Sequence, residues 1–204
     1  MIPSGLKWTA SFALLLASCA PADSPEFNRA IDRFETMVLK YPDEAHDAEA
    51  LMIDPGTGDL FLATKQKRVA RVYAAAREQL ADGATVTLTL AGEISFGDVS
   101  AGDISPDGSE LILRRENAAR LWRRAPGESV EEALKRAGMP ASIVGPPREP
   151  NGESIAFHPE CLGYYTVSEG QHPAIYFFPR RVEWSNSEQR NSEPQTRPTK
   201  QGER

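Results

Sequence analysis

The chain has 204 residues, which is enough for one domain with a buried core, and its 40% hydrophobic and 8% aromatic content is ordinary for a folded protein. Its formal net charge of −6 gives a mildly acidic surface, which excludes a general attraction for nucleic-acid phosphates. We therefore expect a folded protein that has no nucleic-acid partner.

Residues 1–18 have the pattern of an export signal. Lys7 supplies a positive charge, and the apolar stretch over 8–16 is too short to span a bilayer, which takes roughly 20 residues. Residues 16–19 are Leu-Ala-Ser-Cys and resemble the lipobox of bacterial lipoproteins, in which the cysteine is lipidated. A plain secretory signal that contains a cysteine is the alternative.

Acyl chains on Cys19 would hold the protein on a membrane, because each buried methylene contributes about 0.8 kcal/mol. The next residue is Ala20 rather than Asp, which resembles the outer-membrane sorting pattern of Gram-negative lipoproteins. We therefore predict a signal peptide over 1–18 and a tether over 19–33. The resulting protein would be extracytoplasmic, anchored in the outer membrane and facing the periplasm.

A strand expected over residues 34–41 opens the folded domain, and a four-stranded unit follows it. Apolar runs bounded by turn residues predict the strands of this unit at 49–54, 59–64, 69–73 and 85–91. Residues 74–83, between the last two strands, have room for a helical turn.

The second unit contains a helical insertion. Its strands are predicted at 100–105, 110–114, 118–123 and 141–144. Between the last two strands, Ser129 and Glu132 form the sequence pattern of a capping box, in which each side chain accepts a hydrogen bond from the other residue's backbone N–H. A short surface helix is therefore expected over 129–136.

The third unit lacks a fourth strand. Its strands are predicted at 153–158, 164–168 and 174–178, and the residues that follow are mostly polar or proline. Such a composition cannot bury enough apolar surface to offset the chain entropy lost on folding. We therefore predict a disordered tail over 179–204.

The three units repeat one pattern. Pro55, Pro106 and Pro159 each follow the first strand of a unit and lie 51 and then 53 residues apart. Strand-rich units at a period of roughly 40 to 50 residues are typical of β-propeller blades. The sequence therefore predicts an all-β fold over 34–178: a partial β-propeller of about three four-stranded antiparallel blades with a short helical insertion.

Closure of this propeller needs a further element, because closed rings usually have roughly four to eight blades. The last blade of a closed ring is commonly completed by a strand from the other end of the chain, which removes an exposed edge. The strand over 34–41 is available for this. Two chains that exchange it would form a homodimer with six blades; alternatively, the chain is half of a larger ancestral ring and stays open.

Several stretches together resemble a family of exported bacterial β-propeller proteins of mostly unassigned function. The resemblance covers residues 34–178 and implies the C-terminal half of such a propeller, since similar proteins carry further blades upstream. The matching stretches are 41–43, 46–51, 54–55, 57–60, 64–65, 102–108, 153–157 and 165–170.

Propeller topology brings the start of each first strand and the end of each second strand to the same face. Glu49 and Glu153 occupy the first of these positions, and Lys65, Arg114 and Glu169 occupy the second. This rim of the central channel is where ligands commonly bind on such a scaffold. Asp103 is shifted by three positions and is expected at its own turn or at the channel wall. The candidate ligand-binding residues are Glu49, Lys65, Asp103, Arg114, Glu153 and Glu169.

A divalent cation such as calcium is the one cofactor that the rim could hold, through oxygen atoms of Asp47, Glu49 and Glu153. The alternative is that the rim charges pair with one another and join adjacent blades. No catalytic residue is assigned.

The sequence favours a lipid-anchored, extracytoplasmic binding or scaffolding protein with a small-molecule or protein ligand. A cation-dependent propeller hydrolase, phytase-like or lactonase-like, is the second hypothesis. An inactive truncated remnant is the third.

Overall fold

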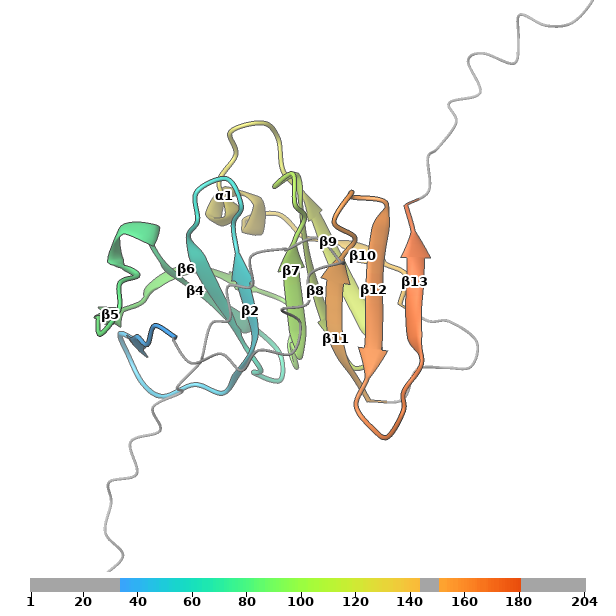
Figure 1. Ribbon diagram of the computed structural model, residues 1–204, viewed down its shortest axis with the longest axis horizontal. Helices are drawn as coiled ribbons and strands as arrows, with labels where there is room; N and C mark the ends of the chain where they lie inside the picture. Colours follow the sequence, from blue (N-terminus) through green and yellow to red (C-terminus); the bar gives the residue numbers. More distant parts are fainter. Residues whose placement is uncertain (1–33, 144–150, 181–204) are drawn as a thin grey trace, which may run out of the picture.

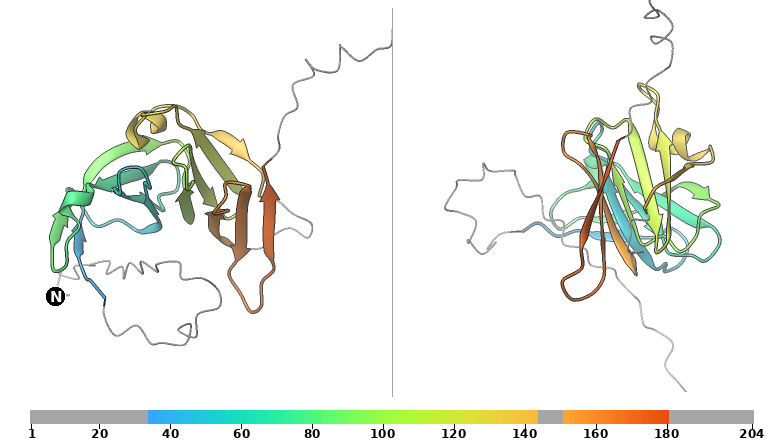
Figure 2. Two further views of the ribbon diagram at one scale, coloured as in Figure 1. Left: turned by 45° about the horizontal axis from the view of Figure 1, so that its top comes forward. Right: turned by 90° about the vertical axis from the view of Figure 1, so that its right-hand side faces the viewer.

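The computed structural model describes residues 34–143 and 151–180, which form three antiparallel β-sheets that fan out side by side in an arc (Figure 1; Figure 2, left). The predicted signal peptide, tether and Cys19 lie outside these residues, as does the predicted tail beyond Arg180. No helix in the described ranges is long and apolar enough to cross a membrane. The all-β, propeller-like fold predicted from the sequence is confirmed.

The first sheet has the order β2-β3-β4-β6. Its strands are β2 (Ala48–Ile53), β3 (Leu60–Thr64), β4 (Ala70–Ala75) and β6 (Thr89–Ile94). The predicted fourth strand over 85–91 is instead divided between β6 and a separate strand, β5 (Thr85–Thr87). The division occurs because Val86 and Leu88 bury their side chains against the outer face of the first sheet, whereas β6 continues along its edge. The predicted helical turn is a 3₁₀ helix at Arg77–Gln79.

The outer face of the first sheet is covered by the N-terminal part of its own chain. Strand β1 (Val38–Lys40) pairs in parallel with β5. Leu39 and Tyr41 pack against the apolar cluster on this face, which includes Leu62 and Tyr73. The strand expected over 34–41 therefore does not serve the third sheet of this chain. The six-bladed homodimer remains a prediction, and it would require β1 to leave β5.

The second sheet has the order β10-β9-β8-β7. Its strands are β7 (Ala101–Ile104), β8 (Glu110–Arg115), β9 (Ala118–Arg123) and β10 (Met139–Ala141), so the fourth strand begins two residues earlier than predicted. The capping box is confirmed: the Glu132 N–H donates to Ser129 Oγ over 3.2 Å, and the Ser129 N–H donates to Glu132 Oε2 over 3.1 Å. It begins helix α1 (Val130–Leu134), whose apolar side chains join the core between the first two sheets.

The third sheet has three strands among the described residues, β11 (Gly152–Phe157), β12 (Gly163–Ser168) and β13 (Ile175–Pro179). Ile155 and Phe157 face the second sheet and are buried there. Ile175 and Phe177 lie on the opposite face and remain 72% and 42% exposed. One face of this sheet is therefore packed and the other is open.

The three prolines occupy equivalent corners, as predicted. Pro55, Pro106 and Pro159 each begin the turn that follows the innermost strand of their sheet, and β7 lies between β2 and β11 (Figure 1). The inner strands approach closely at Gly102, where a Cβ atom would lie only 2.9 Å from the sulfur of Met52. This close packing joins the first two sheets around one core.

Candidate functional site

The rim opposite the proline turns gathers four of the predicted ligand-binding residues. Glu49, Lys65, Glu153 and Glu169 line an open hollow of about 460 Å³. A second hollow, of about 480 Å³, adjoins it and shares Lys65 and Glu153. We call the two hollows together the acidic rim; its further charged residues are Asp98, Arg115 and Glu116. The sequence could predict that these four residues lie on one rim, because the repeated strand–turn–strand pattern determines which strand ends share a face.

Lys65 is the cation at the centre of the acidic rim. Its Nζ lies 2.9 Å from Glu49 Oε1 and 2.8 Å from Glu49 Oε2. The hydrogen bond to Glu49 raises the pKa of Lys65, and the nearby charges of Glu49, Glu153 and Asp47 act in the same direction against the effect of burial. Lys65 therefore stays charged and compensates part of the surrounding negative charge.

Glu153 is a carboxylate of the acidic rim whose negative charge is only partly compensated. Burial raises its pKa, and the negative charges of Glu49 and Glu169 raise it further, while Lys65 and Arg114 lower it. Across both hollows, the lining contains the five carboxylates of Glu49, Asp98, Glu116, Glu153 and Glu169 but only two cationic side chains, those of Lys65 and Arg115. A positively charged group placed here would be attracted by this excess.

The predicted metal ligands do not form a recognisable metal site. Within residues 34–143 and 151–180, no three His, Cys, Asp or Glu side chains are grouped so that they could hold a metal ion. Asp47, Glu49 and Glu153 are among the residues covered by this statement. The ammonium group of Lys65 interacts electrostatically with all three. The calcium site expected at these residues stays a prediction.

Arg114 is buried and joins the second and third sheets. Its side chain is fully inaccessible, and its Nη1 and Nη2 donate to the carbonyl oxygens of Ser154 and Glu116 over 2.9 and 3.0 Å. Ser100 adds a parallel link, because its Oγ donates to the Gly152 carbonyl over 3.0 Å. Arg114 was predicted as a ligand-binding residue, but the structure places its guanidinium beneath the rim.

Asp103 lies away from the acidic rim and also links two sheets. Its Oδ2 accepts a hydrogen bond from the Phe157 N–H over 2.7 Å, and its Oδ1 accepts one from the Ile104 N–H over 2.9 Å. Burial raises the pKa of Asp103, although these two hydrogen bonds oppose the increase. The expectation that Asp103 serves the wall of the channel fits this position better than a ligand-binding role does.

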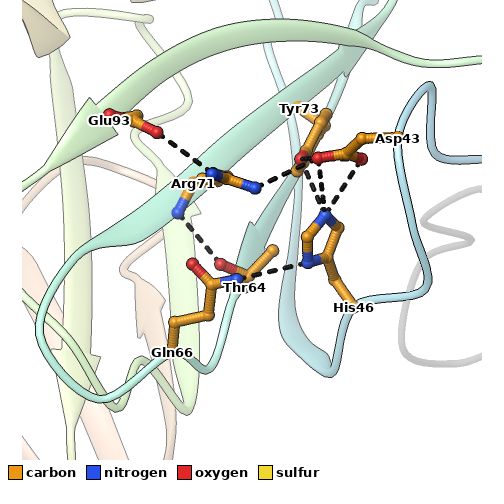
Figure 3. Close-up of polar contacts among 7 residues, drawn as sticks. All are labelled: Asp43, His46, Thr64, Gln66, Arg71, Tyr73 and Glu93. Atoms are coloured by element: carbon orange, nitrogen blue, oxygen red, sulfur yellow. Dashed lines mark hydrogen bonds and ion pairs between the residues drawn. The ribbon is translucent and has the colours of Figure 1, made fainter.

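A polar cluster that no sequence pattern indicated lies beside the first sheet (Figure 3). Asp43 accepts hydrogen bonds from the Tyr73 hydroxyl over 3.0 Å and from Arg71 Nη1 over 3.0 Å. His46 Nε2 lies 3.0 Å from Asp43 Oδ1 and 2.9 Å from the Tyr73 hydroxyl, and Gln66 Nε2 contacts His46 Nδ1 over 3.2 Å. The cluster fastens the segment between β1 and β2 to strand β4.

The hydrogen bonds in this cluster decide the charge of Asp43. Desolvation alone would raise its pKa, but the Glu44 backbone N–H and the His46 and Tyr73 side chains stabilise the carboxylate and lower the pKa to about 2. Tyr41 packs edge-on against the rings of His46 and Tyr73, and burial raises its pKa to about 12. Asp43 and His46 are only three residues apart, but Tyr73 is 30 residues from Asp43, so no local pattern could have indicated the group.

No protein-family model matches this chain, and no curated protein matches it. Many solved structures are similar to it, and three of them show how low the identity is. These three are the Kuenenia stuttgartiensis hydrazine synthase (16% identity, TM-score 0.43, 65% of this chain and 34% of that chain), a nidogen/laminin complex (10%, 0.44, 64% and 43%) and Saccharomyces cerevisiae Sqt1 (9%, 0.48, 71% and 35%). The chain therefore spans less than half the length of each of these proteins.

Proposed function

We propose that the protein is a lipid-anchored, extracytoplasmic binding or scaffolding module that holds a positively charged ligand at its acidic rim. The observation that carries this proposal is the excess of carboxylates around the single Lys65–Glu49 pair in an open hollow. A ligand with an ammonium or guanidinium group would interact with Glu153 and Glu169, which make no ion pair among the described residues.

An organic cation fits this rim better than a bare metal ion. Calcium takes six to eight oxygen ligands in a compact shell. The rim carboxylates are instead spread over two wide hollows, and Lys65 lies among the three predicted metal ligands. An amine on a flexible chain can contact separated carboxylates one at a time, so a polyamine or a basic peptide segment is the ligand class that we propose.

The proposed location depends on the N-terminal sequence, in which Lys7, the apolar stretch and Cys19 are arranged as in a lipoprotein signal. Cys19→Ser is expected to move the protein from the membrane fraction to the soluble fraction and to remove the mass of the acyl chains. A protein that stays on the membrane without acylation would contradict the lipid anchor.

The binding proposal is tested by titrating the full chain, purified in mild detergent, with spermidine in a calorimeter. We expect saturable binding that Glu153→Gln and Glu169→Gln each weaken about three- to tenfold, because each removes one carboxylate from the rim. Glu160→Gln is the matched control: it changes the net charge equally but lies in the proline turn at the other end of the third sheet. It should leave the affinity unchanged.

Lys65→Gln gives a prediction of the opposite sign. Removing the internal cation makes the rim more negative, so spermidine should bind more tightly.

Glu153→Gln removes a carboxylate that is partly shielded from solvent. Because the pKa of Glu153 is raised in the folded protein, its charged form lowers the stability of the fold at neutral pH. We therefore expect this variant to melt at a higher temperature while it binds less spermidine, which separates loss of binding from loss of folding.

Three outcomes would contradict the organic-cation proposal. The first is that spermidine does not saturate a folded protein, and the second is that Glu160→Gln weakens binding as much as the rim variants do. The third outcome is stabilisation by calcium that a chelator reverses and that Glu49→Gln and Glu153→Gln abolish. That result would favour the cation-dependent hydrolase instead.

A further inference from the structure

A third hollow lies between the first and second sheets and shares no lining residue with the acidic rim. Its walls are the end of β6 with the residues that follow it (93–96), Arg120 and Trp122 of β9, and the last residue of helix α1 with the segment that follows it (134–138). Its volume is about 240 Å³. We call it the basic pocket because three of its lining side chains are cationic, those of Arg120, Lys135 and Arg136.

Two of the ionised groups in the basic pocket already have partners. Glu93 accepts a hydrogen bond from Arg71 Nε over 3.0 Å, so its negative charge is compensated on the side of the first sheet. Arg136 pairs with Glu128, and its Nη2 lies 3.0 Å from Glu128 Oε2. The pocket therefore depends on the remaining two cations for its net charge.

Arg120 and Lys135 have no carboxylate partner among the described residues. The hydrogen bond of the Arg120 guanidinium there is from Nη1 to the Gly138 carbonyl, over 2.7 Å, so further N–H donors remain for a ligand. Lys135 is exposed at the C-terminal end of α1. In a protein with a net charge of −6, two uncompensated cations at one pocket are a local exception.

A further cation, Arg115, lies close to this pocket because it packs on the ring of Phe96, which lines the pocket. The guanidinium carbon of Arg120 lies 5.8 Å from the centre of this ring, and that of Arg115 lies 5.4 Å from the same centre. Arg115 also lacks an ion pair within the described ranges, and its buried Nε has no hydrogen-bond partner there. Two like charges on one aromatic ring repel each other, and a bound anion would reduce this repulsion.

The walls of the basic pocket are held in place by neighbouring contacts. Trp122 Nε1 donates to the Arg136 carbonyl over 3.0 Å, which joins β9 to the segment after α1. Gly138 lies flat on the Trp122 ring, where a Cβ atom would come within 2.7 Å of Cζ2. The pocket thus has a preformed shape, which lowers the ordering cost of binding.

We propose that the basic pocket binds a small dianionic oxyanion, such as a four-carbon dicarboxylate, whose charged oxygen atoms contact Arg120 and Lys135. Its volume of about 240 Å³ holds several water molecules and therefore leaves room for a small ligand of this kind. Arginine is well suited to such ligands because its planar guanidinium can bind a carboxylate or a phosphate with two parallel hydrogen bonds.

The probes are succinate and inorganic phosphate, titrated into the full chain in mild detergent, with 1,4-butanediol as the uncharged analogue of succinate. Binding is followed by calorimetry and by the NMR signal of the Trp122 indole N–H, which is assigned with Trp122→Phe. We expect saturable binding of succinate and a shift of this signal. Arg120→Gln should weaken binding roughly tenfold or more, and Lys135→Gln about threefold.

Lys67→Gln is the matched control, because it removes one positive charge from an exposed side chain outside the basic pocket. It should leave the affinity unchanged. Tighter binding of phosphate than of succinate, with the same dependence on Arg120 and Lys135, would support the site and identify phosphate as its oxyanion.

The proposal would be overturned if neither anion bound saturably to a folded protein, or if 1,4-butanediol bound as well as succinate. It would also be overturned if Lys67→Gln weakened binding as much as Lys135→Gln, since the attraction would then be general. Because Lys135 is exposed, its variant should remain folded even if Arg120→Gln does not.

Discussion

The first and third sheets lie at the two ends of the arc (Figure 2, left), and they differ in how far their outer faces are covered. The outer face of the first sheet is covered by β1, β5 and the segments beside them, so that Leu62 and Tyr73 are almost completely buried. The corresponding face of the third sheet leaves Ile175 and Phe177 exposed. In a closed propeller both faces would be covered by neighbouring blades. Here the chain supplies a cover at one end and, in its described part, none at the other.

This difference indicates where stability is concentrated. The first sheet is packed on both faces and fastened by the Asp43–His46–Tyr73 cluster (Figure 3). The third sheet depends on its single packed face, on the hydrogen bonds that Arg114 and Ser100 donate to it, and on the hydrogen bond that Asp103 accepts from it. We therefore expect the third sheet to open more readily than the first.

The largest effect is expected from removing part of the cover of the first sheet. Leu88 is 1% exposed, so Leu88→Ala should leave a cavity and lower the free energy of unfolding by about 3 kcal/mol. Ile175→Ala, on the open face of the third sheet, should change it by less than about 0.5 kcal/mol. Urea denaturation measures both. Equal losses would mean that the open face is covered in solution.

A smaller effect is expected from removing the buried link to the third sheet. Arg114→Met leaves the carbonyl oxygens of Ser154 and Glu116 without their donor, which should cost about 2 kcal/mol. Amide hydrogen exchange should accelerate in β11 to β13 and stay slow in β3 and β4. Acceleration throughout the chain would contradict the idea that the third sheet opens separately.

The same contrast separates what the sequence could predict from what it could not. The proline turns, the inner strands and the contact of Glu49 with Lys65 follow from a local pattern repeated at a fixed period, and the capping box follows from a local motif. The cover of the first sheet does not, because the alternation over 85–91 is compatible with one strand, and only tertiary packing of Val86 and Leu88 divides it. Arg114 follows three apolar residues of β8, a position that could have indicated a buried guanidinium.

The smallest effect is expected from weakening the Asp43 cluster, which helps to hold β1 on the first sheet. This effect should depend on pH. The pKa of Asp43 is about 2 in the folded protein, below its ordinary value of 3.8, because hydrogen bonds stabilise the carboxylate. Between these two values the unfolded chain binds more protons than the folded one. The contribution of Asp43 is therefore complete above about pH 3.8 and is lost as the pH falls towards 2.

Amide exchange in β1, followed from pH 5 to pH 2 and corrected for the intrinsic rate, should show this loss as a progressive release of the strand. Asp43→Asn should release β1 already at pH 5, because the ion pair with Arg71 is gone, and should remove the part of the pH dependence that belongs to this carboxylate. Glu44→Gln is the neighbouring control, since Glu44 makes no side-chain ion pair among the described residues. If β1 stayed protected in Asp43→Asn at every pH, apolar packing of Leu39 and Tyr41 alone would hold the cover, and the polar cluster would have no part in closing this end of the arc.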